Sequence, residues 1–296
     1  MSKLLGLIDS VNGLPDPAKK RSNTHKIPWV SPEKLYCMII SRVSAVLGSI
    51  VADAASLPLE WIYKDSTMKE IVGDNNPEFW KECKCPFFTV PMGHKSCYGD
   101  EMANSLKTLA GNDGQVDLKK ISSALKAFYG SPDSPYQAAL ARRADKKYPV
   151  EGPWINGGVI QFLKNSSAGQ VPPGSAECED NDGFALSLPV FLKDSTQIKE
   201  VAELLTTNPM VLQHLAVQTR ILKHYLEGTE DPVRVSQSEL KDKFPEVCQE
   251  IQEVADAVNA KSSLGDIVEQ FGKACGLPGS FQGSIAALLI HNDYVG

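Results

Sequence analysis

Apolar residues recur every three or four positions along most of the chain, which is the spacing of one face of an α-helix. The first such stretch begins at Ser31-Pro32-Glu33, where serine can cap a helix and proline fits the first turn. Apolar positions continue at this spacing towards Ala54. Ser56-Leu57-Pro58 then interrupts the pattern, because proline cannot continue the backbone hydrogen bonds of a helix. The pattern therefore predicts a long helix over residues 32–54.

Helical spacing also dominates the remainder of the sequence. Residues 62–99 contain Pro77, Pro86 and Pro91 with few periodic runs, and we expect them to be irregular. Helices are expected near Asp100, after residue 117 and at 135–147, 155–164, 183–192, 196–206, 209–227, 244–260, 264–275 and 281–291. Sustained alternation of period two does not occur in the sequence, so the predicted fold class is all-α.

Composition narrows the classes of function that the chain can have. The 296 residues are 42% hydrophobic and carry a formal net charge of -6, which argues against general binding to a nucleic-acid backbone. Lys19-Lys20-Arg21 lies in a polar N-terminal stretch and is typical of a solvated tail. We expect residues 1–30 to be a polar extension and residues 31–296 to form a single domain, because no long linker divides them.

The sequence also bears on localisation. No uninterrupted apolar run reaches the roughly 18 residues of a membrane span, and Leu4-Leu5-Gly6-Leu7-Ile8 is shorter than the core of a signal peptide. Seven scattered cysteines do not form a disulfide framework. We therefore expect a cytoplasmic protein without a membrane or nucleic-acid partner.

Two acidic residues stand out near the end of the first predicted helix. Asp53 lies among small apolar residues, and a carboxylate in such a stretch needs polar partners. It could belong to a functional site, together with Glu60. The structural alternative is that Asp53 caps a neighbouring helix while Glu60 is exposed.

A second acidic pair, Asp100 and Glu101, lies at a predicted helix start. Adjacent carboxylates can bind a hard cation such as Mg²⁺, which prefers oxygen ligands. The structural alternative is that Asp100 caps the helix and Glu101 complements its dipole. Cys83, Cys85 and Cys97 with His94 could supply zinc ligands, but their spacing departs from the paired knuckles of structural zinc sites.

Together these segments resemble a known family. Ala52-Asp53-Ala54-Ala55-Ser56-Leu57-Pro58-Leu59-Glu60 and Gly99-Asp100-Glu101-Met102 are similar to two motifs of the ADP-ribosylglycohydrolases, and Asp180-Asn181-Asp182-Gly183 extends the likeness. Tyr98-Gly99-Asp100 and the stretch 278–283 resemble the branch of that family with the J-type crystallins of jellyfish lenses and selenoprotein J. The resemblance implies a compact orthogonal multi-helix bundle.

The resemblance also implies roles for individual residues. Family enzymes use a pair of Mg²⁺ ions, of which Asp100 and Glu101 would keep a half-site. Glu60 matches a glutamate near the reacting sugar, and Asp53 and Gly99 would line a residual ADP-ribose cleft. Gly99 lacks the hydroxyl of the family threonine and Glu101 is longer than the family aspartate. No late acidic pair precedes Gly296, so we expect the family's C-terminal segment to be missing.

These departures lead to a functional expectation. The resemblance favours a structural eye-lens crystallin that descends from an ADP-ribosylglycohydrolase, without hydrolase activity, a cofactor or a specific partner. Two alternatives remain open. One is an Mg²⁺-dependent ADP-ribosyl hydrolase, and the other is a pseudoenzyme that binds ADP-ribose.

Overall fold

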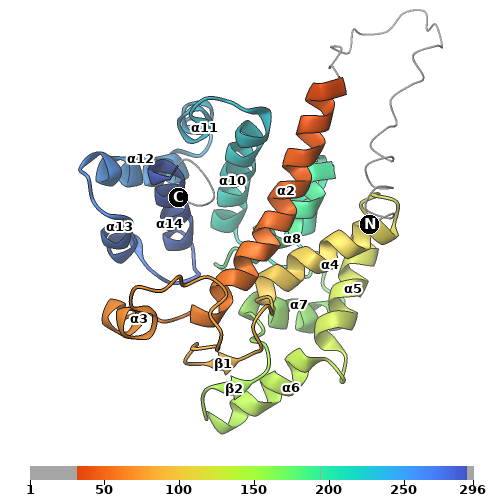
Figure 1. The fold of residues 1–296 in the computed structure, drawn as a ribbon. Helices are drawn as coiled ribbons and strands as arrows, with labels where there is room; N and C mark the ends of the chain where they lie inside the picture. Colours follow the sequence, from red (N-terminus) through yellow and green to blue (C-terminus); the bar gives the residue numbers. More distant parts are fainter. Residues whose placement is uncertain (1–31, 194, 292–296) are drawn as a thin grey trace, which may run out of the picture.

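Helix α2 (Pro32–Ser56) is the long helix that the sequence predicts, and it ends in the 3₁₀ turn η1 (Leu57–Leu59) at the expected proline. The computed structural model describes residues 32–193 and 195–291 (Figure 1). Ser31, the expected N-terminal extension and the last residues, 292–296, lie outside the described part. The expected division into an extension and a single domain therefore stays a prediction.

The all-α fold class is confirmed, with thirteen α-helices and very little strand in the described part. After α2 come α3 (Asp65–Val72), α4 (Cys97–Gly111), α5 (Leu118–Gly130), α6 (Pro135–Arg142), α7 (Gly157–Ser167), α8 (Asp182–Lys193), α9 (Ile198–Ala202), α10 (Pro209–Glu227), α11 (Pro232–Leu240), α12 (Pro245–Asn259), α13 (Leu264–Phe271) and α14 (Gly279–Ile290). Two further 3₁₀ turns are η2 (Arg143–Asp145) and η3 (Ser195–Gln197).

The prediction that residues 62–99 are irregular is wrong in two places. Helix α3 lies within them, and strand β1 (Phe88–Thr89) pairs in parallel with β2 (Val150–Glu151). Helix α11 was also not predicted. Both missed helices are short and mostly polar, so their few apolar residues give little periodic signal.

The helices pack around two main hydrophobic cores. The first lies among α4 to α8 and contains Leu125, Tyr129 and Phe162, which are fully buried. The second lies among α10 to α14 and contains Ile251 and Phe281. Burial of each such side chain contributes about 1.5–3 kcal/mol. Figure 1 shows α2 running between the two groups of helices. A smaller cluster of α2, α4, α8 and α10 residues joins them.

Helix α2 has an exposed apolar stripe. Ile40, Leu47 and Val51 are 46%, 42% and 48% exposed. The segment Ile40–Leu59 is long and apolar enough to cross a membrane by length and composition alone, although it contains no uninterrupted apolar run of that length. Arg42 and Asp53 interrupt it. Arg42 donates to the carbonyl of Leu192 on α8, at 3.1 Å.

Candidate functional site

The start of helix α4 is held by an aspartate from α2. Ser96 caps α4 and accepts a hydrogen bond from the backbone N–H of Gly99, at 3.3 Å. The Ser96 backbone N–H donates to Asp53 Oδ2 at 2.8 Å, and its hydroxyl donates to Asp53 Oδ1. Asp53 therefore has polar partners from a neighbouring helix, as the structural alternative expected, but Ser96 is the cap and Asp53 holds it in place. Burial raises the pKa of Asp53, although the Ser96 hydrogen bonds oppose that shift.

Gly99 makes room for this carboxylate. A Cβ on Gly99 would overlap Asp53 Oδ2 and also lie about 3.0 Å from the Cβ of Lys95. Real Cβ atoms essentially never approach another atom as closely as this one would approach Oδ2. A threonine, as in the family motif, therefore does not fit here while Asp53 keeps its place.

Asp100 is occupied by two protein donors. Lys95 Nζ lies 2.9 Å from Asp100 Oδ1, and the Tyr136 hydroxyl donates to Asp100 Oδ2 at 2.7 Å. The expectation that Asp100 caps α4 is wrong, because Ser96 is the cap and Asp100 is the fourth helical residue. The ammonium group of Lys95 supplies the positive charge beside this carboxylate.

Glu101 and Asp182 form a buried acidic pair between α4 and α8. Both side chains are 0% exposed. Asn156 Nδ2 donates to Asp182 Oδ1 at 2.7 Å, and the Cys97 thiol lies 3.5 Å from Glu101 Oε1. Within the described residues Glu101 Oε2 has no hydrogen-bond partner. Burial and then the charge of Asp182 raise the pKa of Glu101 well above its usual range.

Asp182 was named from the sequence only as part of the family likeness, and its place in the site was not predicted. Glu177 and Glu179, which precede it, are exposed, whereas Asp182 is fully buried. Burial and the charge of Asp180 raise the pKa of Asp182 to about 7. A signal was present in the sequence, since Asp182 is followed directly by the apolar residues of α8.

Glu60 lies directly after η1 and is partly buried, so the expectation of an exposed Glu60 is wrong. Burial and the charge of Asp53 raise its pKa to about 7. Trp61 follows with a φ of 61°, a strained conformation for a bulky residue, and packs edge-on against Trp154 at a centroid distance of 5.2 Å.

Space beside Glu60 is divided between two hollows. The hollow towards Ser96 and Trp154 has a volume of about 10 Å³, enough for about one water molecule. A second hollow of about 280 Å³ lies on the other side, between Trp61 and Cys275. Glu60 could exchange a proton near neutral pH, but the hollow that it shares with the α4 start is too small for a sugar.

All five residues predicted from the sequence come together where α2 ends and α4 begins: Asp53, Glu60, Gly99, Asp100 and Glu101. We call this group the α2–α4 site. The structure adds Lys95, Ser96, Tyr136 and Asn156, which the sequence did not single out, and Asp182, which the sequence named only within the family likeness.

The residues of the α2–α4 site do not fit a Mg²⁺ ion. Mg²⁺ requires charged or polar oxygens in near-ideal octahedral geometry. Here Asp53 and Asp100 are already engaged by protein donors, and the ammonium of Lys95 places a positive charge 2.9 Å from Asp100 Oδ1. Residues 32–193 and 195–291 contain no group of three or more His, Cys, Asp or Glu side chains that could hold a metal ion. Cys85 and Cys97 of the weighed zinc set are free, buried thiols.

Sequence comparison places the chain among known proteins. No family profile matches it. Crystallin J1A of Tripedalia cystophora is 28% identical over 261 residues, which cover 85% of this chain and 78% of the relative. Crystallin J1B of the same organism is 27% identical over 264 residues, with the same coverage. The similarity covers most of the chain, and the chain is homologous to the jellyfish J-crystallins, which belong to the ADP-ribosylglycohydrolase family.

Proposed function

We propose that this protein is a structural, crystallin-type descendant of an ADP-ribosylglycohydrolase and does not hydrolyse ADP-ribosyl bonds. The observation that carries the proposal is the engagement of two carboxylates of the α2–α4 site, Asp53 and Asp100, by protein donors. Ser96 holds Asp53, and Lys95 with Tyr136 holds Asp100. Carboxylates that would bind metal in a hydrolase here fix the start of α4.

Charge and similarity support the same proposal. A net charge of -6 favours repulsion between molecules and solubility at high concentration. The named relatives are crystallins. The proposed setting is the cytoplasm of cells that accumulate the protein, as a lens cell would.

The catalytic part of this proposal is tested with the purified chain. Calorimetric titration with Mg²⁺ or Mn²⁺ is expected to show no saturable heat at millimolar metal. An ADP-ribosylated protein or free O-acetyl-ADP-ribose is expected to stay intact in the same buffers. Release of ADP-ribose that depends on added metal would overturn the proposal.

The structural part needs a tissue measurement. Quantitative immunoblotting across tissues is expected to find the protein most abundant in the lens or an equivalent refractive tissue. Light scattering should give a positive second virial coefficient that falls as salt is added, because salt screens like charges. Uniform low abundance in all tissues contradicts a lens role.

A pseudoenzyme that binds ADP-ribose is the second candidate, and one observation favours it. Glu60, with a pKa of about 7, borders the hollow of about 280 Å³ that Trp61 and Cys275 also line. Lys273 lies at this hollow and could approach a diphosphate, although it already pairs with both Asp65 and Glu269. Calorimetric titration with ADP-ribose separates the crystallin-type function from the pseudoenzyme. If no heat is observed at millimolar ADP-ribose, the pseudoenzyme is excluded.

A further inference from the structure

An open groove lies far along the chain from the α2–α4 site. Its walls come from α8, α9, α10 and α11, and its volume is about 620 Å³. This is within the range of about 300–1,000 Å³ for small-molecule sites. Four large apolar side chains line it: Phe191, Ile198, Leu240 and Phe244. Three of them are only partly buried, so they offer apolar surface to a ligand.

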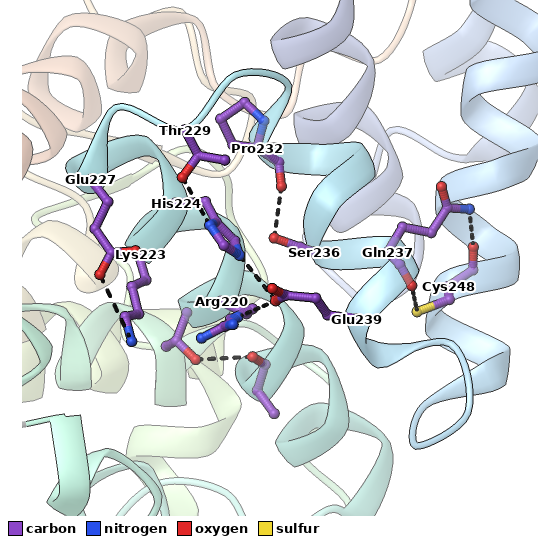
Figure 2. A network of polar contacts seen from close by, with 12 residues as sticks. Arg220, Lys223, His224, Glu227, Thr229, Pro232, Ser236, Gln237, Glu239 and Cys248 are labelled. Carbon is purple, nitrogen blue, oxygen red and sulfur yellow. Dashed lines mark hydrogen bonds and ion pairs between the residues drawn. The ribbon is translucent and has the colours of Figure 1, made fainter.

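The charged residues of the groove are predominantly basic, in a chain whose net charge is -6. Arg220, Lys223 and Lys243 line it, against one acidic residue, Glu239. The carboxylate of Glu239 is already paired with two side chains of α10. Figure 2 shows Glu239 of α11 reaching two side chains of α10, Arg220 at 2.5 Å and His224 at 3.0 Å.

The two lysines are much less constrained. Lys223 lies 3.8 Å from Glu227, and both side chains are about half exposed, at 48% and 47%. Such an exposed pair contributes little and yields easily to another anion. Lys243 forms no ion pair with a residue of the described ranges, and its ammonium lies 5.2 Å from the centre of the Phe244 ring. The groove thus combines apolar walls with two available positive charges.

We propose that this groove binds a fatty carboxylate of medium chain length. The carboxylate would pair with Lys243 and Lys223, because charge-assisted hydrogen bonds to an ammonium are the strong ones. The alkyl chain would lie against Phe191, Leu240 and Phe244 and leave water. This site is separate from the α2–α4 site and does not depend on the crystallin proposal.

The charge requirement is tested with decanoate below its micellar concentration, by calorimetry on the full chain. Saturable binding at one site is expected. Lys223→Glu/Lys243→Glu should weaken it by about tenfold or more, since loss of one such interaction corresponds to about a factor of ten. Lys119→Glu/Lys126→Glu on α5 is the matched control, with the same net charge and expected wild-type affinity. Equal weakening by both double variants overturns the proposal, because it shows that only net charge matters.

The location is tested by filling the groove. Ala216 of α10 lines it, and Ala216→Trp should abolish decanoate binding while both lysines remain. Circular dichroism and the thermal midpoint establish that each variant is folded. Decanol, which has the same chain without the charge, should bind at least tenfold more weakly than decanoate. Unchanged affinity in Ala216→Trp, or no saturable binding to the wild type, overturns the proposal.

Discussion

Asp53 and Ser96 lie 43 residues apart in sequence, yet one carboxylate accepts hydrogen bonds from both the backbone N–H and the hydroxyl of that serine. Ser96 in turn accepts from the N–H of Gly99. A side chain of α2 thereby orders the residue that caps α4. The relationship explains why a carboxylate is present in an otherwise small and apolar helix segment.

Removing this carboxylate should destabilise the protein. Asp53→Ala leaves the Ser96 N–H and hydroxyl without their acceptor, and we expect a loss of about 1–3 kcal/mol in the free energy of unfolding. Urea denaturation measures it. Asp74→Ala, at an exposed aspartate for which no contact is seen in the described structure, should change stability by less than about 0.5 kcal/mol. Equal effects at the two positions would argue against the capping role.

Gly99 and Asp53 should be energetically coupled. A Cβ at position 99 overlaps the Asp53 carboxylate, so Gly99→Ala is expected to cost about 1–3 kcal/mol in the wild type. In an Asp53→Ala background the same change should cost at least about 0.5 kcal/mol less. Gly111→Ala on the same helix meets no atom within 4 Å and should leave stability unchanged or slightly raised. Additive effects of the two α2–α4 changes would contradict the predicted overlap.

The buried acidic pair should make stability fall as pH rises. The pKa of Asp182 is about 7 in the folded protein and 3.8 ordinarily, so the folded state keeps a proton that the unfolded state has lost. The contribution is present below about pH 4 and is lost on going up to about pH 7. Asp182→Asn should flatten this dependence, measured by urea denaturation at several pH values. If the free energy of unfolding of Asp182→Asn falls with pH as steeply as that of the wild type, other groups cause the pH dependence.

Glu239 should have the opposite effect at acidic pH. Hydrogen bonds from Arg220 and then His224 lower its pKa from 4.5 to about 2. Its contribution is therefore present above about pH 4.5 and is lost as the pH falls towards about 2. Glu239→Gln should reduce the acid sensitivity of the thermal midpoint. Asp242→Asn, at a nearby exposed position, serves as the control. Its thermal midpoint should depend on pH in the same way as that of the wild type.

Much of the fold could be predicted from local signals in the sequence. Helix α10 begins after Asn208, whose side chain accepts from the N–H of Met210 at 3.0 Å, and ends at Gly228 with a φ of 69°. Both residues were the predicted boundaries. Such caps depend on neighbours a few positions away, so sequence alone determines them.

The candidate site was harder, because its chemistry depends on contacts between distant segments. The sequence brought Asp53 and Asp100 together only through the family resemblance. It did not indicate that Lys95 and Tyr136 would engage Asp100, or that Asp182 would be buried beside Glu101. An acidic neighbourhood predicts exposure, and only the packing of α8 against α4 reverses that prediction for Asp182.

The small cluster that joins the two cores has a consequence for cooperativity. Val46 of α2, Met102 of α4, Leu188 of α8 and Leu222 of α10 meet in it. A neighbouring cluster around Ala202 and Leu215 also packs α9 and α8 against α10. Unfolding of one group of helices is therefore communicated to the other through these two clusters. A truncation such as Val46→Ala should lower the thermal midpoint and weaken this coupling, which would broaden the melting transition.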